Sequence, residues 1–385
     1  MKNFWNLFRI KTTVLRDLGF IGVSNIAGTG ISGFFWFFLA SLLGPEDYGE
    51  VQFYIAIAGM TYLLASIGSP SVITVYAAKN IKIHSTLFFI SILGGLIALV
   101  ILFGIFVRID IGLLVLTFII YDLSINYLLG KKNYSKYSIN FLIQKGLMLG
   151  LGIGFYYLFG VEGIIFGIAL SYIHFILLAF KITRDSKIDF SLLKSKSGFI
   201  TNNYVESSIG GIKGEIDKII IVPLLGFTLL GNYALAMQVY TILTILSMTV
   251  FKYILPQDAT GVSNSELKKI TVGISVIISI LTVILAPIII PYLFPDYPDT
   301  VIAVQILSLS VVPATIGYLY ISKFLGAEKS RFVLIGRIIA LSSLVIGMLI
   351  LPEYFGIVGA ASAFVISSIC QTGFFMISKN RYMNN

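Results

Sequence analysis

The sequence predicts an all-α polytopic membrane protein with twelve transmembrane helices, and two observations lead to this prediction. The 385 residues are 57% hydrophobic and 12% charged, with a mean hydropathy of +0.95, far from the balance of a soluble domain. Apolar runs of about 20 residues, the length that crosses a bilayer as a helix, recur along the whole chain. The predicted spans are 17–43, 47–68, 84–107, 111–130, 137–159, 161–181, 199–225, 228–252, 269–294, 299–322, 332–351 and 355–378.

The distribution of basic residues predicts the orientation of these spans. Twenty-two of the 27 Lys and Arg residues fall in the two termini and the even-numbered loops, whereas the odd-numbered loops carry Arg108 alone among several acidic residues. This is the positive-inside pattern, and it places both termini in the cytoplasm and the protein in the cytoplasmic (inner) cell membrane. The net charge of +9 therefore reflects topology, and we expect membrane lipids rather than nucleic acid as partners.

Few side chains are available for catalysis or metal binding. The single cysteine, Cys370, excludes an internal disulfide and a thiolate cluster, and His84 and His174 lie far apart in the sequence. Nucleotide-binding, zinc-protease and serine-hydrolase signatures are missing. The external loops are short turns, which argues against a membrane polymerase or ligase. We therefore expect no enzyme activity and no cofactor.

Paired glycines predict an internal repeat. Leu42-Leu43-Gly44 after the first span matches Leu224-Leu225-Gly226 after the seventh, and Gly49 matches Gly231, all at an offset of 182 residues. At an offset of 196, Leu129-Gly130 pairs with Leu325-Gly326, Phe159-Gly160 with Phe355-Gly356, and Gly163 with Gly359. Two six-helix bundles related by an axis along the membrane normal account for this pattern. The predicted domains are 1–181, a cytoplasmic linker 182–198, and 199–385.

The seventh span carries an unusual load of charge. Glu206, Lys213, Glu215, Asp217 and Lys218 lie within 199–225, and five ionisable groups near mid-membrane would cost about 12 to 17 kcal/mol. This span must therefore face other helices or a watery cavity. Glu206, Lys213 and Asp217 share one helix face. Lys213 can form an ion pair with Asp217 at the spacing i,i+4, and Glu215 can form one with Lys218 at i,i+3.

Other polar residues inside predicted spans complete the set of candidates. Lys145 and Arg337 fall on corresponding parts of the fifth and eleventh spans, and Asn25 lies among small residues of the first. The structural reading is that ion pairs and snorkelling lysine or arginine side chains satisfy these groups. The functional reading is that cations line a cavity and attract an anion, while a carboxylate binds H⁺ or Na⁺. Candidates for substrate binding are Lys213, Lys145, Arg337 and Asn25, and candidates for ion coupling are Asp122, Glu206 and Asp217.

Several short motifs resemble those of a known family. They are Gly44-Pro45-Glu46-Asp47-Tyr48-Gly49, Glu215-Ile216-Asp217-Lys218 followed by Leu224-Leu225-Gly226, then Gly231-Asn232-Tyr233-Ala234-Leu235-Ala236, and Gly160-x-x-Gly163. Together they resemble the Wzx-type polysaccharide (O-antigen) flippases of the multidrug/oligosaccharidyl-lipid/polysaccharide (MOP) exporter superfamily, over essentially the whole chain.

The resemblance implies a MATE-like pair of bundles that translocates an isoprenoid-linked oligosaccharide, a polysaccharide repeat unit, from the cytoplasmic to the outer leaflet by alternating access. It implies that cavity cations hold the lipid phosphate or pyrophosphate, and that polymerase and glycosyltransferase machinery acts alongside. The alternative within the superfamily is a cation-coupled exporter of drugs or other small molecules. An unrelated two-half facilitator is disfavoured because residues 68–82 lack its charged signature.

Overall fold

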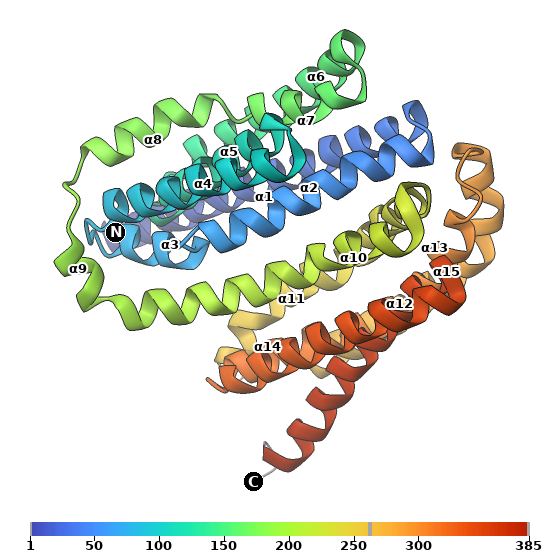
Figure 1. The fold of residues 1–385 in the computed structure, drawn as a ribbon. Coiled ribbons are helices and arrows are strands. Elements are labelled where there is room, and N and C mark those ends of the chain that lie inside the picture. Colours follow the sequence, from blue (N-terminus) through green and yellow to red (C-terminus); the bar gives the residue numbers. More distant parts are fainter. Residues whose placement is uncertain (1, 261–263, 383–385) are drawn as a thin grey trace. The chain divides into compact units, whose positions relative to one another are not determined.

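The computed structural model describes residues 2–260 and 264–382, and within these ranges the chain is helical without any strand (Figure 1). Polar backbone groups inside a bilayer must bond within the protein, which an α-helix achieves along its own length. The helices are α1 (Lys2–Leu42), α2 (Pro45–Ala65), α3 (Pro70–Ala78), α4 (His84–Phe106), α5 (Ile109–Gly130), α6 (Tyr134–Phe159), α7 (Val161–Leu170), α8 (His174–Arg184), α9 (Phe190–Ser195), α10 (Ser197–Leu243), α11 (Ile245–Ala259), α12 (Ser265–Leu293), α13 (Thr300–Leu309), α14 (Val311–Gly326) and α15 (Ser330–Tyr382).

These helices account for the twelve predicted crossings. The described chain contains nine apolar helical stretches long enough to span a membrane, and a tenth if α2 and α3, bent by 47°, form one span. Two stretches, Ser197–Leu255 and Ser330–Lys379, are 59 and 50 residues long, more than twice the length of one crossing. Each is interrupted by a glycine with non-helical dihedrals, Gly226 or Gly356, so each supplies two crossings. The prediction of an all-α, twelve-span protein is confirmed.

Packing divides the chain into two compact units. The first consists of Met1–Trp36 and Ile57–Ser208, and the second of Phe37–Ala56 and Ile209–Asn385. The turn between α1 and α2, with the ends of both helices, therefore packs with the second unit. The domain boundaries 1–181, 182–198 and 199–385 stay a prediction from the sequence repeat.

Each unit has a buried core and a broad apolar exterior. In the first unit, α3, α4, α5 and α7 bury side chains such as Leu87, Leu114 and Ile168. In the second, Tyr233, Leu307 and Leu344 belong to one cluster contributed by α10, α12, α13 and α15. On α4 and α12, apolar residues such as Val100 (69% exposed) and Ile288 (67% exposed) point away from the protein. Such surfaces are stable in contact with lipid chains rather than water.

Turn geometry confirms the repeat at the offset of 196 residues. Lys132 and Glu328, which correspond at this offset, both adopt left-handed backbone conformations with φ of 56° and 57°. The following residues, Asn133 and Lys329, donate to the carbonyls of Leu128 and Phe324, again a corresponding pair. The two turns are therefore the same helix-ending motif, although one carries a basic and the other an acidic side chain.

The repeat-related turns at the offset of 182 residues pack against one another inside the second unit. A methyl group added at Gly49 would overlap the carbonyl oxygen of Phe227, and one added at Gly231 would overlap that of Pro45. Because 227 corresponds to 45 and 231 to 49, the two contacts are related by the same local two-fold symmetry. Only glycine allows the backbones to approach this closely.

This contact predicts that Gly231→Ala and Gly49→Ala each lower the free energy of unfolding by about 1 to 3 kcal/mol, because the new methyl group must displace backbone. The measurement is the thermal unfolding midpoint of the purified protein in detergent.

The matched control is Gly273→Ala in α12, where an added methyl group meets no atom within 4 Å. That change should leave stability equal or raise it by up to about 1 kcal/mol, since alanine is the better helix former. Equal midpoints for all three variants would contradict the close contact.

Candidate substrate and ion sites

Two of the predicted cations converge in the second unit. Lys213 on α10 is half-buried and donates to the side-chain oxygen of Gln371 on α15, at 3.4 Å. The Arg337 guanidinium, also on α15, packs against α10 at Gly210, where a Cβ added to the glycine would lie 3.4 Å from the guanidinium nitrogen. It is near enough to Lys213 for the two positive charges to repel each other. The Tyr318 phenol of α14 is near enough to the same guanidinium to interact with it electrostatically. Helices α10, α14 and α15 thus bring two positive charges and two neutral polar groups together.

The negative charge that shares the Lys213 face is bonded elsewhere. Asp217 is buried and accepts hydrogen bonds from the Tyr233 hydroxyl at 2.9 Å and from the Lys218 backbone N–H at 2.9 Å. Within the described chain no ion pair joins Lys213 to Asp217, so that predicted pairing is wrong. The reason is that tertiary packing places the Tyr233 hydroxyl, from the next crossing of α10, in hydrogen-bonding contact with this carboxylate. Lys213 therefore makes no ion pair with a carboxylate among the described residues.

The second predicted pair of the seventh span is confirmed. Lys218 donates to Glu215 at 2.7 Å, one helical turn apart, and both side chains are largely buried. A buried charge is tolerated when it is paired and hydrogen-bonded. This pair therefore neutralises two of the five charges of the span and leaves Lys213 as the cation available to a ligand.

In the first unit, the predicted cation lies on an aromatic ring. The Lys145 ammonium on α6 is 5.4 Å from the centroid of Phe141, a cation–π distance, and has no ion pair within the described residues. Phe141 corresponds to Arg337 at the offset of 196, so Lys145 stands one helical turn beyond the matching position. Asn25 on α1 accepts a long hydrogen bond of 3.5 Å from the Tyr137 hydroxyl, next to this segment of α6.

Asp122 on α5 is the buried acid of the first unit. Asn126 donates to its Oδ1 at 3.0 Å, whereas Oδ2 is buried with no hydrogen bond of standard geometry from any described residue, although the Tyr62 phenol is adjacent. An unsatisfied buried oxygen is costly unless a proton or cation occupies it at times. Glu206, the third predicted acid, is half-buried on α10 and belongs to the first unit.

Three contacts of the cations were not predicted from sequence. Gln371 and Tyr318 lie in the last and tenth spans, and nothing in their local sequence marks them as partners of Lys213 or Arg337. A signal did exist for Phe141, which precedes Lys145 by one helical turn and therefore shares its face. Within the described residues, no three His, Cys, Asp or Glu side chains converge as a metal site.

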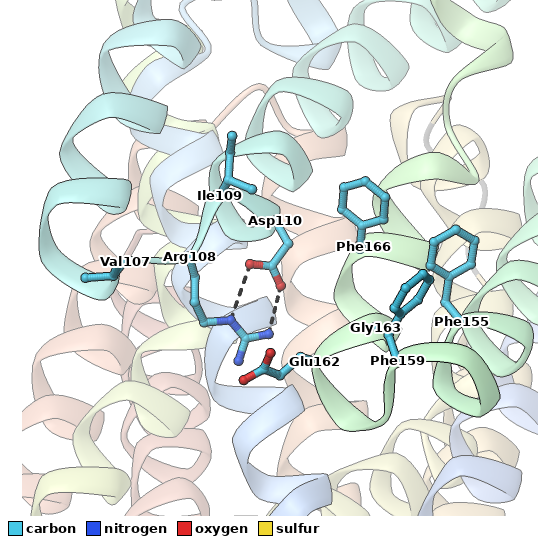
Figure 2. Close-up of a pocket in the computed structure, with 9 residues that line it drawn as sticks. All are labelled: Val107, Arg108, Ile109, Asp110, Phe155, Phe159, Glu162, Gly163 and Phe166. Atoms are coloured by element: carbon cyan, nitrogen blue, oxygen red, sulfur yellow. Dashed lines mark hydrogen bonds and ion pairs between the residues drawn. The ribbon is translucent and has the colours of Figure 1, made fainter.

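A cavity of about 470 Å³ in the first unit lies where α4 meets α5 and α6 meets α7 (Figure 2). Arg108 donates to both oxygens of Asp110, at 3.3 and 2.8 Å, and the exposed Glu162 points toward the same opening. The rings of Phe155, Phe159 and Phe166 form the apolar wall. Arg108 is the one basic residue predicted outside the cell, and this pairing neutralises its charge.

Comparisons with known proteins identify the architecture. No family model and no curated protein sequence match this chain. Solved structures do match. An inward-facing multidrug resistance MATE family transporter of the MOP superfamily aligns with a TM-score of 0.68 and 17% identity, over 93% of this chain and 94% of that one. The chain has the fold of these transporters.

Two further structures extend this result. The lipid II flippase MurJ, in an inward closed conformation, aligns with a TM-score of 0.78 and 12% identity, over 93% of this chain and 87% of that one. A MOP superfamily transporter from Pyrococcus furiosus Vc1 aligns at 0.58 and 17% identity, over 95% of this chain and 92% of that one, and its binding pocket is described as reversed in polarity. Proteins with this fold thus transport different substrates, so the substrate class must be inferred from the charged side chains of each chain and not from the fold.

The Asp217 network predicts that Tyr233→Phe lowers the free energy of unfolding by about 1 to 3 kcal/mol, because a buried carboxylate loses a hydrogen-bond donor. The measurement is thermal unfolding in detergent. Tyr292→Phe serves as the control, since Tyr292 on α12 is 85% exposed and makes no hydrogen bond within the described residues. If both variants unfold at the same temperature, the hydrogen bond does not contribute to stability.

Proposed function

We propose that this protein is a membrane flippase that translocates an isoprenoid-linked oligosaccharide from the cytoplasmic to the outer leaflet by alternating access. The observation that carries the proposal is Lys213. It is a half-buried ammonium within a membrane span, beside the Arg337 guanidinium, and it makes no ion pair with a carboxylate among the described residues. Two adjacent cations in such a place favour an anionic ligand, and a phosphate or pyrophosphate carries the required charge.

The first unit also contains a candidate cation for binding an anion. Lys145 lies one helical turn beyond the position that corresponds to Arg337, and we propose it as a further substrate-binding residue. Asn25, with its amide near α6, is the proposed neutral hydrogen-bond partner of the sugar or phosphate. One structure of the same fold belongs to a protein described as a lipid II flippase, which supports a lipid-linked substrate.

We further propose that a carboxylate couples transport to H⁺ or Na⁺. Asp122 is the strongest candidate because its Oδ2 is buried and unsatisfied within the described residues, so a bound proton or cation would remove an energetic penalty. Asp217 already accepts two hydrogen bonds and is the weaker candidate, and Glu206 completes the proposed set. No cofactor is required by this scheme.

The proposed location is the cytoplasmic (inner) membrane, with both termini in the cytoplasm, as the positive-inside pattern predicts. There the cytoplasmic leaflet supplies the lipid-linked repeat unit. The proposed partners are the glycosyltransferases that build this unit and the polymerase that uses it in polysaccharide (O-antigen) biosynthesis.

A second function is supported by the multidrug resistance transporters that share the fold. In that case the chain would export small drug-like molecules in exchange for a cation, and the acidic residues Asp122 and Asp217 would bind the coupling ion. The positive charges of Lys213 and Arg337 argue against cationic drugs as substrates. A dye-efflux assay in cells that express the protein distinguishes the two, since a flippase should export no dye.

The flippase proposal predicts that Lys213→Ala lowers translocation roughly 10- to 100-fold while the protein still folds, because a charge-assisted hydrogen bond to phosphate contributes about 1.5 to 3 kcal/mol. The measurement is the appearance of fluorescently labelled, isoprenoid-pyrophosphate-linked saccharide in the outer leaflet of proteoliposomes. In cells, loss of the protein should cause such lipid to accumulate on the cytoplasmic face.

The control is Lys269→Ala, which removes an exposed lysine from the first turns of α12. Translocation by Lys213→Ala at the wild-type rate, with normal expression, would exclude the proposed role of this cation. Recovery of function by the double exchange Lys213→Asp with Asp217→Lys would instead indicate a pair of structural charges.

A further inference from the structure

A second, separate cluster of positive charge lies in the first unit, at the end of the helices where the predicted cytoplasmic loops are. A cavity of about 270 Å³ is enclosed there by the C-terminal end of α3, the turn 79–83, the start of α4 and the ends of α5 and α8. Its volume is slightly below the range of typical small-molecule pockets, about 300 to 1,000 Å³, and suits a headgroup. The lining residues are Ala77, Asn80, Ile81, Lys82, His84, Tyr127, Lys131 and Asp185.

The cationic side chains of this cavity differ in how firmly they are held. Lys131 donates to the side chain of Asn80 at 2.6 Å and lies 5.7 Å from the centroid of the Tyr127 ring, so its ammonium is fixed. Asn80 itself adopts a left-handed backbone conformation, with φ of 54°, just after the end of α3. Lys82, on that segment, makes no hydrogen bond or ion pair within the described part of the chain. One lysine is therefore preorganised and the other is available to a ligand.

A buried histidine forms the floor of the cavity. His84 is 6% exposed, its ring lies 5.0 Å from that of Tyr127, and its Nε2 is 3.1 Å from the Ser186 hydroxyl. His84 is the first residue of α4, and no side chain caps the N–H groups of this helical turn. Their partial positive charge adds to that of the two lysines.

Hydrogen bonds hold the cavity wall in place. The segment 183–189, which leads from α8 toward α9, is bonded to the start of α4: Ser85 donates to the Thr183 carbonyl at 2.8 Å, and the Asp189 N–H donates to Thr86 at 2.8 Å. This fixes Asp185, the only acidic residue in the lining, at the edge of the site. Beyond it the surrounding loops are basic, with Lys79, Lys132, Lys181, Arg184 and Lys187 close in sequence.

Apolar surface continues directly from the basic site. On α8, Ile176, Leu177 and Phe180 are 46%, 70% and 67% exposed, and the last turn of the same helix carries Lys181 and Arg184. Phe89 of α4 and Phe190 of α9 add two exposed rings 6.4 Å apart. A molecule with a negative headgroup and hydrocarbon chains would fit both the basic cavity and the apolar surface of α8, whereas a free phosphate would contact only the cavity.

We infer that the cavity formed by Lys82, His84 and Lys131 binds the phosphate headgroup of an anionic phospholipid of the cytoplasmic leaflet. The two ammonium groups, with Asn80 beside them, contact the phosphate, and the acyl chains lie along the apolar face of α8. The site belongs to the first unit alone and does not depend on the substrate proposed above.

The test uses the full-length protein in neutral detergent, titrated with phosphatidylglycerol and followed by native mass spectrometry. Phosphatidylcholine and glycerol 1-phosphate are the comparison ligands. We expect phosphatidylglycerol to bind at least tenfold more tightly than either one, because it alone combines net negative charge with acyl chains. Equal binding of phosphatidylcholine would overturn the site, and equal binding of glycerol 1-phosphate would assign the cavity to a soluble phosphate instead.

Variants locate the binding to this cavity. Lys82→Gln with Lys131→Gln should weaken phosphatidylglycerol binding at least tenfold, while Lys187→Gln with Lys194→Gln, which makes the same charge change outside the lining, should leave it within twofold of wild type. Asp185→Asn removes the one opposing charge and should strengthen binding severalfold, a gain that a misfolded protein cannot produce. Unchanged affinity in the first double variant and in Asp185→Asn would refute the inference.

Discussion

The close backbone contact between two equivalent turns is the constraint on which the second unit depends. Gly49 and Gly231 each lie against a carbonyl of the opposite turn, and both contacts follow the 182-residue repeat. Because the α1–α2 turn is anchored this way, Tyr297 can donate to the Leu43 carbonyl at 2.8 Å and close the core from the same end. The ring of Phe227 then packs on that of Phe53, 5.6 Å away. Two glycines, which allow the turns to approach this closely, thus determine the packing of one end of the unit.

The repeat preserves backbone geometry and leaves the side chains free to differ. Lys132 and Glu328 have the same left-handed conformation and the same hydrogen bonds after them, yet opposite charges. Phe141 and Arg337 occupy matching positions with unlike chemistry. The two units therefore share a backbone arrangement and differ in the cations proposed to bind substrate: a lysine on an aromatic ring in the first, and a lysine with an arginine in the second.

Sequence reasoning predicted most of the fold because the relevant signals are local. Apolar runs of bilayer length indicate spans, glycines at a fixed offset indicate the repeat, and the pairing of Glu215 with Lys218 follows from helical spacing alone. The choice of partner for Asp217 was not predictable in this way. Two partners, Lys213 and Tyr233, were geometrically available, and only tertiary packing decided between them. Likewise, the approach of Gln371 to Lys213 depends on how α15 folds back on α10, which no local pattern encodes.

The charges of the seventh span have a consequence for biosynthesis. Glu215 and Lys218 can pair as soon as their own helical turn forms, and Tyr233, 16 residues after Asp217, leaves the ribosome shortly afterwards. Gln371 follows Lys213 by 158 residues, so it is made long after the span that carries Lys213. During that interval Lys213 must be satisfied by water, by lipid phosphates or by the insertion machinery. The residue on which transport is proposed to depend thus meets its Gln371 partner long after its own span has been made.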